Sequence, residues 1–349
     1  MTISFGFGLI TCQRYPGDSR SDTDLYAQAL ELASQADALG LDSVWVSEHH
    51  FVDDSYMPSL LTMCAAMAAR TERILVGTAL LLAPLYEPVR LAEDAAAVDL
   101  ISAGRLILGL GLGWRDEEFE GLGVSLRDRV PRLVDTIITL RQAWGAEAVT
   151  GGSLVTYPGL AVRPRPHQPG GPPLWIGALS EPAIRRAGSL ADGFMATDVD
   201  PELFATQVTW AREESRRRAA PSQPFTIGLH LPTFVWDEPD AFEIVRDHVR
   251  YVDWKYEDME EAHHRTGESP APPALATADE DRLRRASLVG TPDEVAARIH
   301  KFQQAAGGDF HFIARLYLPG LDYAIQQRTL ELFAVEVVPR VRRLVQRER

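Results

Sequence analysis

The 349-residue sequence has little cysteine, no excess of positive charge and no long hydrophobic run. Its only cysteines, Cys12 and Cys64, provide neither a disulfide framework nor a thiolate metal cluster, and we expect both to be packed thiols. The formal net charge of −14 argues against a nucleic-acid partner, which favours a basic face. No apolar run reaches the roughly 18 residues that span a bilayer, and the first residues lack a signal-peptide head. We therefore expect a cytoplasmic protein with no membrane partner.

Short apolar runs, in contrast, recur along the whole chain. The hydrophobic content of 46% is typical of a globular enzyme. Eight runs read as strands with helical patterns between them: 3–10, 41–46, 73–82, 105–110, 174–177, 193–196, 225–235 and 309–318. This alternation predicts an α/β fold, a single (β/α)8 TIM-type barrel over residues 1–349. The alternative is an open doubly wound sheet, but no Gly-x-Gly-x-x-Gly motif opens the first strand–helix turn.

Two segments depart from this rhythm. Residues 149–166 hold two short strand-like runs joined at Gly151-Gly152, which predicts a hairpin insertion after the fourth strand–helix unit. Residues 267–286 contain three prolines among small and acidic residues, which predicts a mobile loop before the eighth strand. Long loops in compact domains are often lids, so we expect this one to cover an active site.

Glu48, His49 and His50 follow the second predicted strand directly. Imidazole titrates nearest neutrality, so a histidine pair beside a carboxylate can move protons at working pH. The alternative is a hydrogen-bonded cluster at a strand end that has no chemical role. In a barrel, however, the carboxyl ends of the strands form the active site, and the segment 111–114 and Ser180 fall at the same edge. This shared location favours a catalytic role for the three residues.

Several motifs, in the correct order, resemble those of the bacterial luciferase-like flavin monooxygenases. The resemblance runs nearly from end to end and is carried by these segments: Glu48-His49-His50-Phe51, Gly77-Thr78-Ala79-Leu80, Arg90-Leu91-Ala92-Glu93-Asp94, Gly104-Arg105, Glu117-Glu118-Phe119 and Val289-Gly290-Thr291-Pro292-Asp293-Glu294. It implies a TIM-type barrel that binds reduced flavin at the carboxyl ends of its strands and activates dioxygen.

The resemblance also implies roles for particular residues. His49 matches the family's catalytic histidine, and Ala79–Leu80 matches a peptide bond that is cis in the family. Ser180 matches a residue that binds the flavin phosphate, and it precedes a helix whose free N–H groups favour an anion; the alternative is an ordinary helix N-cap. Glu118 matches an acidic residue near the flavin edge, the alternative being a carboxylate that faces solvent.

The chain also departs from the family pattern. Luciferase subunits carry a cysteine and an arginine where this chain has Gly111 and Leu112, so the cation that neutralises the phosphate is unassigned. Leu179 replaces the glutamate that usually precedes the phosphate serine. The glycine-rich segment 109–114 is similar to that of relatives that use the deazaflavin F420, although those commonly have Asp-His where this chain has Glu48-His49. We expect FMN as the cofactor, with F420 as the alternative.

The resemblance implies a two-component monooxygenase. A separate flavin reductase supplies reduced FMN, since no nicotinamide-binding fingerprint is present. Oxygen then gives a C4a-hydroperoxyflavin that transfers one oxygen atom to a small organic substrate. One alternative is an F420-dependent oxidoreductase that transfers hydride on the same barrel. Another is a non-catalytic flavin-binding partner subunit, against which the retained His49 argues.

The remaining expectations concern the substrate, metals and assembly. Four residues suggest a largely apolar substrate pocket: Phe7, Trp114, Phe194 and Met195. We expect no metal, because His263-His264 has no third ligand nearby and fits a solvated helix end. A homodimer is expected from the small residues of the helices after the second and third strands, since relatives dimerise through this region: Ala65, Ala66, Ala69, Ala92, Ala95 and Ala96.

Overall fold

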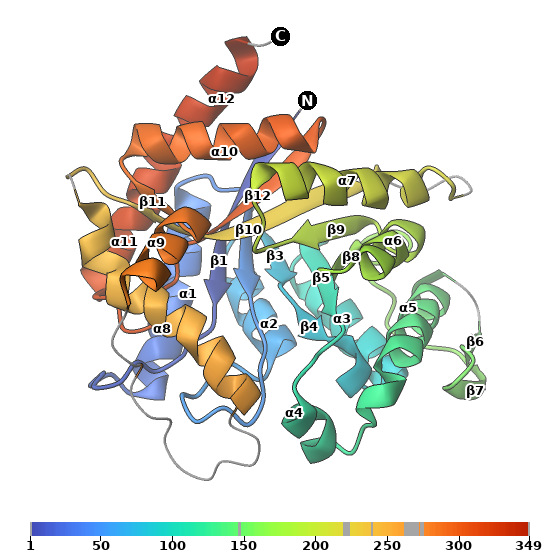
Figure 1. The fold of residues 1–349 in the computed structure, drawn as a ribbon. Coiled ribbons are helices and arrows are strands. Elements are labelled where there is room, and N and C mark those ends of the chain that lie inside the picture. Colours follow the sequence, from blue (N-terminus) through green and yellow to red (C-terminus); the bar gives the residue numbers. More distant parts are fainter. Residues whose placement is uncertain are drawn as a thin grey trace.

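Eight parallel strands close into a barrel in the computed structural model, which describes residues 2–145, 148–218, 224–238, 240–261, 272 and 276–347 (Figure 1). The last strand of the barrel pairs with the first, and the seventh pairs with both the sixth and the eighth. In order around the barrel the strands are β1 (Ile3–Ile10), β2 (Ser43–Val46), β3 (Leu75–Thr78), β5 (Leu106–Gly111), β8 (Leu174–Gly177), β9 (Gly193–Ala196), β10 (Thr226–Val235) and β12 (Phe310–Arg315). This closed sheet confirms the predicted (β/α)8 barrel over the open doubly wound alternative.

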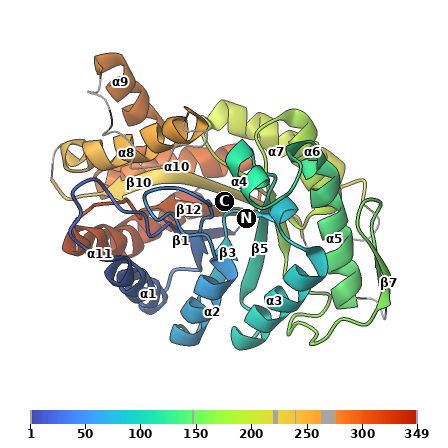
Figure 2. The same cartoon turned by 90° about the horizontal axis from the view of Figure 1, so that it is seen from below.

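Eight helices surround the strands as an outer ring (Figure 2). Local sequence sets several of their ends: Ser21 with Asp24, and Thr291 with Glu294, form capping boxes that satisfy free backbone N–H groups. The ring consists of α1 (Asp22–Ala38), α2 (Leu60–Arg70), α3 (Pro88–Ile101), α5 (Arg129–Gly145), α6 (Glu181–Leu190), α7 (Pro201–Ser215), α10 (Pro292–Ala306) and α11 (Tyr323–Leu332). Within the described residues, no helix is long and apolar enough to cross a membrane.

The predicted third strand is divided in two. β3 ends at Thr78 and the short strand β4 (Leu81–Leu82) continues it, and both pair with β5. Between them the Ala79–Leu80 peptide bond is cis, which confirms the expectation from the resemblance. A second non-proline cis bond, Gly8–Leu9, lies in β1 and was not predicted.

The hairpin insertion is present. β6 (Val149–Gly151) and β7 (Thr156–Leu160) pair antiparallel. Asp135 of α5 accepts hydrogen bonds from the backbone N–H groups of Ser153 and Val155, at 2.9 and 2.8 Å. The turn of the hairpin is thereby fixed to the outer face of the barrel, away from the carboxyl ends of the strands.

The expected loop at 267–286 is wrong for its second half, where α9 (Thr277–Ala286) forms. Acidic Asp279 and Glu280 lie in its first turn and basic Arg284 and Arg285 in its last, an order that favours a helix through its dipole. Except for Pro272 and Ala276, the rest of that segment lies outside the described residues, as does the His263-His264 pair.

Between β10 and β12 the chain also forms α8 (Ala241–Glu261) and the short strand β11 (Leu288–Gly290), which pairs with the end of β10. The other additional elements are η1 (Ala83–Leu85), α4 (Asp116–Gly121), η2 (Leu126–Asp128), the π-helical turn η3 (Phe333–Val337) and α12 (Val338–Arg347). Of these, α8 and α9 contribute side chains to the wall of the cavity described below.

Two tryptophans fill the interior of the barrel. The rings of Trp45 and Trp175 lie with centroids 5.2 Å apart, and both contact His311. Glycines on neighbouring strands leave room for them, since a Cβ at Gly193 or Gly228 would lie within 2.8 Å of the Trp175 ring. The barrel interior is therefore a packed core below its carboxyl edge.

Phe7 and Phe194 do not line a pocket, so their predicted role is wrong. Both are buried between the barrel and its helices. Neighbouring residues of a strand face opposite sides, so Met195 faces the interior and Phe194 faces the helices. In β1 the register shifts between Phe7 and Ile10, and Leu9 faces the interior instead.

The alanine argument for dimerisation is also partly wrong. Ala92, Ala95 and Ala96 are fully buried within the subunit, so they offer no surface to a partner. They pack α3 closely against its neighbours in the core. On the same helix Leu100 and Ile101 are exposed. The homodimer itself stays a prediction.

Candidate active site

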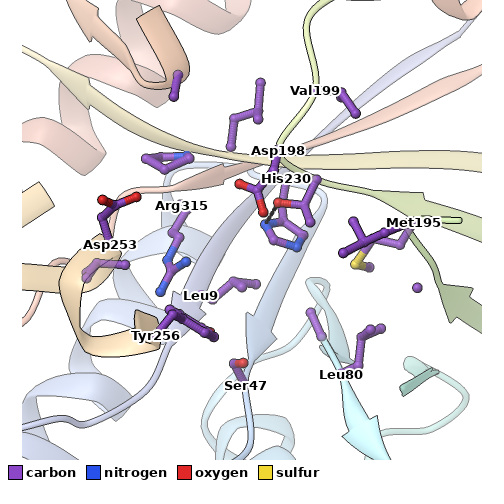
Figure 3. A pocket seen from close by; sticks show the side chains of 18 of the residues that line it. Leu9, Ser47, Leu80, Met195, Asp198, Val199, His230, Asp253, Tyr256 and Arg315 are labelled. Carbon is purple, nitrogen blue, oxygen red and sulfur yellow. Dashed lines mark hydrogen bonds between the residues drawn. The ribbon is translucent and has the colours of Figure 1, made fainter. Parts of the chain in front are cut away.

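A cavity of about 1240 Å³ opens at the carboxyl ends of the strands (Figure 3). Most of the residues predicted for the site line it: Glu48, His49, Ala79, Leu80, Gly111, Leu112, Trp114, Leu179, Ser180 and Met195. Two others, His50 and Glu118, lie behind the wall as hydrogen-bond partners of its residues. The strand-end rule of the barrel fold therefore brings together positions that are far apart in the sequence.

His49 is held by Glu118. Its Nδ1 lies 2.8 Å from Glu118 Oε1, which also accepts the backbone N–H of His50 at 2.9 Å. Glu118 is fully buried, so the alternative of a solvent-facing carboxylate is wrong. A carboxylate at Nδ1 requires the proton there, which leaves Nε2 as the free position of the neutral ring. Within the described part of the chain, Nε2 makes no hydrogen bond.

Aromatic side chains fix the plane of the His49 ring from three sides. Tyr56, Trp114 and Tyr256 pack edge-on against it with centroid distances of 4.8, 5.9 and 5.6 Å. The Tyr56 hydroxyl donates to Ser47 Oγ at 3.0 Å and lies 3.2 Å from the Tyr256 hydroxyl. His49 is therefore only 5% exposed although it borders the cavity.

Glu48 joins the second strand to the third. Its Oε2 accepts the backbone N–H of Leu82 at 2.9 Å, and its Oε1 accepts from the Tyr86 hydroxyl at 2.9 Å and lies 2.7 Å from His50 Nε2. Burial alone would lower the pKa of His50, but the hydrogen bond and charge of Glu48 outweigh it and raise that pKa. Glu48 thus positions the segment after the Ala79–Leu80 bond.

Leu80 forms part of the cavity floor. Its side chain fits against two neighbouring strands at glycines, because a Cβ at Gly111 or Gly177 would collide with it. A Cβ at Gly111 would lie 3.0 Å from Leu80 Cβ. The floor is therefore shaped by one large side chain from β3–β4 and by the absence of side chains on β5 and β8.

Another part of the wall suits an anion. Ser180 precedes α6 and is its N-cap by backbone position. Its hydroxyl makes no capping hydrogen bond, so the side chain does not act as an ordinary N-cap. Arg129, at the start of α5, lines the same cavity, and its guanidinium has no ion-pair partner in the described residues. Sequence reasoning missed Arg129 because only Leu112 was compared with the family arginine.

Four further residues at the mouth were also missed. Asp198 follows β9 by two residues and His230 lies in the middle of β10. Tyr256 comes from α8, and Arg315 is the last residue of β12. Burial, with the nearby charge of Arg315, lowers the pKa of His230 to about 3, so this ring is neutral. Arg315 was missed because the eighth strand was predicted to run to residue 318, which hid its position at the strand end.

A comparison with protein-family models identifies the family of this chain. Residues 5–309 match the model of the luciferase-like monooxygenases. The chain belongs to the luciferase-like monooxygenase family. The identification from sequence motifs is thus confirmed, and the matched region runs from within β1 to the residue before β12.

Relatives within the luciferase-like family are oxidoreductases of two cofactor types. The oxygenase component of a flavin-dependent trigonelline monooxygenase from Acinetobacter baylyi is 29% identical over 174 residues, which are 49% of this chain and 48% of that protein. The match thus spans about half the length of that relative. An F420-dependent glucose-6-phosphate dehydrogenase from Amycolatopsis mediterranei is 30% identical over 334 residues, 90% of this chain and 94% of that enzyme.

Solved structures of luciferase-like monooxygenases share the fold. Monooxygenase RslO1 from Streptomyces bottropensis has a TM-score of 0.80 at 26% identity, covering 96% of this chain and 99% of that one. The oxygenating constituent of 3,6-diketocamphane monooxygenase from Pseudomonas putida, in complex with FMN, has a TM-score of 0.76 at 21% identity, covering 96% and 98%. The two cofactors expected from the sequence, FMN and F420, are thus both those of similar enzymes.

Proposed function

We propose that this chain is the oxygenase component of a two-component monooxygenase that uses reduced FMN, supplied by a separate reductase, and dioxygen to oxygenate a small organic substrate. The observation that carries the proposal is the His49–Glu118 pair, which leaves His49 Nε2 free at a cavity floored by the cis Ala79–Leu80 peptide. Cytoplasmic location and a homodimer are part of the same proposal.

The residues of the cavity fit FMN. Its volume exceeds the roughly 300–1,000 Å³ of ordinary small-molecule sites, which leaves room for a cofactor and a substrate together. The free N–H groups of α6, the Ser180 hydroxyl and the Arg129 guanidinium would hold the phosphate. Ala79, Leu80 and Gly111 would bed the flavin ring. When bound, the reduced flavin supplies the two electrons and reacts with dioxygen.

His49 would hold or move one proton at Nε2 during the reaction. Glu118 keeps Nδ1–H in place and stabilises the ring when both nitrogens carry protons, so one position alone exchanges with the cavity. Glu48 and His50 would act indirectly, by holding the strand that carries Leu80. The catalytic role therefore belongs to His49, and its two neighbours are positioning residues.

The aromatic wall would keep water from the reacting atoms. Trp114, Tyr56 and Tyr256 surround His49, and Leu80 and Met195 make the adjoining surface apolar. A water-poor site suits oxygen transfer, since reactive intermediates decay by hydrolysis. Of the four residues predicted to line an apolar substrate pocket, Trp114 and Met195 therefore keep that role in the proposal.

A second candidate is F420-dependent hydride transfer. It is favoured by the F420-dependent relative that aligns along 90% of the chain, against 49% for the flavin-dependent one. On the same geometry His49 Nε2 would give or take the proton that accompanies the hydride. A non-catalytic partner subunit is less consistent with a fully positioned His49.

Anaerobic titration with reduced FMN and, separately, reduced F420 tests the proposal, followed by rapid mixing of each complex with oxygen. We expect tighter binding of reduced FMN and its reoxidation in the complex. Preferential binding of reduced F420 with no reaction with oxygen would favour the hydride-transfer enzyme instead.

A further inference from the structure

Arg315 is a buried cation without a counter-ion in the part of the chain that the structure describes. It ends β12 at the carboxyl edge of the barrel and is 7% exposed. No carboxylate of the described residues forms an ion pair with it, and its Nε has no hydrogen-bond partner. Taking a charge out of water without a partner is costly, and most buried charges are paired or bind a ligand. The guanidinium therefore requires a partner that the described residues do not supply.

The guanidinium faces the cavity. Figure 3 shows it extending from the strand toward Tyr256, with Leu9 and Ser47 beyond. Its Cζ lies 5.8 Å from the centre of the Tyr256 ring, which is a weak cation–π contact. Tyr256 in turn packs against His49, so an aromatic surface leads from Arg315 to the proposed catalytic ring.

The two acidic residues nearby do not neutralise Arg315. Asp253 is already paired with Arg282, at 2.6 and 3.0 Å. Asp198 lies beyond ion-pair distance of Arg315; partial removal from water raises its pKa, which the charge of Arg315 opposes. His230, whose pKa is lowered, adds no charge of its own. Beside the aromatic ring of Tyr256, the positive charge of Arg315 thus remains without a partner among the described residues.

We propose that Arg315 binds the carboxylate of an aromatic carboxylic acid substrate, whose ring lies along Tyr256 toward His49. A guanidinium matches a carboxylate through two parallel hydrogen bonds, and this fork geometry also sets orientation. The anion at one end and the ring at the other would fix which carbon reaches His49. This inference rests on the proposed function and specifies its substrate class.

Binding of benzoate and of benzamide, its neutral analogue, tests the inference by calorimetry on the full-length protein with and without FMN. Hydrogen bonds to charged groups contribute enough to make benzoate bind roughly 10- to 100-fold more tightly than benzamide. Arg315→Gln is expected to abolish that preference, and Arg315→Lys to keep part of it. Arg298→Gln is the matched control, because Arg298 lines the same cavity but donates to the backbone carbonyls of Ser287 and Arg285, and it should keep the preference.

The binding measurements would overturn the inference if they showed no measurable benzoate binding, equal binding of the two probes by the wild type, or a preference that survives Arg315→Gln. Loss of reduced-FMN binding in Arg315→Gln would also overturn it, by assigning the guanidinium to the cofactor. FMN binding by the wild type tests the proposed function separately.

Unfolding of Arg315→Met in urea is an independent measurement. Replacing an uncompensated buried charge by an apolar side chain of similar length should leave the protein as stable as the wild type or more stable. A clear loss of stability would show that the guanidinium is structural and contradict the inference.

Discussion

The two ends of the barrel interior are built differently, and β12 shows both. Near its start, His311 Nε2 lies 2.6 Å from Ser43 Oγ, which also accepts the indole N–H of Trp45 at 2.6 Å. At its end, Arg315 Nε has no such partner among the described residues, and behind His49 the Glu118 Oε2 atom also lacks one. Buried polar groups are normally satisfied, and at the cavity a bound ligand would account for these exceptions. One end of the barrel is thus a finished core, and the other is shaped for a ligand.

The largest effect should come from the ligand end, in His49→Ala. Removing a group that transfers a proton should lower turnover of an identified substrate about 10²- to 10⁴-fold. FMN binding should be unchanged. His50→Ala is the matched control, because His50 lies behind the wall and should cost far less. Steady-state kinetics of both variants measures this, and equal losses would contradict the assignment of Nε2.

Trp45→Ala should have the largest effect on stability. The substitution leaves a cavity in the packed interior of the barrel. Truncation of a large buried side chain lowers the free energy of unfolding by about 3–5 kcal/mol. Trp114→Ala, at the cavity and 37% exposed, should cost about 1 kcal/mol or less. Urea denaturation compares the two. A similar cost for both would mean that the ends are equally packed.

Acid should weaken the packed end through His311. Burial lowers its pKa to about 4, whereas in the unfolded chain it takes up a proton near 6.5. Protonation thus favours unfolding: the stability is complete above about pH 6.5 and falls as the pH drops toward 4, by up to about 3 kcal/mol. Denaturation at pH 7 and pH 5 should show a smaller loss for His311→Gln than for the wild type. An identical loss would contradict this.

The smallest effect should come from His50 and should have the opposite sign. Its pKa is raised by Glu48 against the effect of burial, so its contribution to stability is complete below about pH 6.5. It is lost as the pH rises through the raised value. Between pH 6.5 and pH 8 the wild type should therefore lose a small part of its stability that His50→Gln does not lose. Thermal unfolding across this range is the measurement.

The sequence predicted the barrel because its signal is repeated eight times. Each strand is short and apolar, and errors of a few residues at one boundary do not change the count. Details that depend on a single position were harder. The cis Ala79–Leu80 bond came from the family resemblance alone, and the division of the third strand there was not predicted. The helix at Thr277–Ala286 was missed because prolines nearby dominated the interpretation.

At the site, His49 was predictable because it stands beside a clear strand. Arg315 was not, since an arginine after an apolar run reads equally well as an exposed residue. Its meaning depends on the absence of partners, which only the packing of Tyr256, Asp198 and Asp253 reveals. Phe194 was misplaced for a simpler reason: it was assigned to the same pocket as Met195, although adjacent strand residues face opposite ways.

The fit of Leu80 against two glycines has a consequence for how this chain can diverge. Luciferase subunits carry cysteine at the position of Gly111, yet here any side chain at 111 would meet Leu80 Cβ at 3.0 Å. The residues at positions 80, 111 and 177 therefore do not change independently of one another. A smaller residue at 80 would remove the Cδ1 atom that a Cβ at 177 would meet at 2.1 Å, whereas the contact at 111 is with Leu80 Cβ and remains for every residue at 80 except glycine. Mutational routes to a different floor at 177 therefore pass through position 80 first.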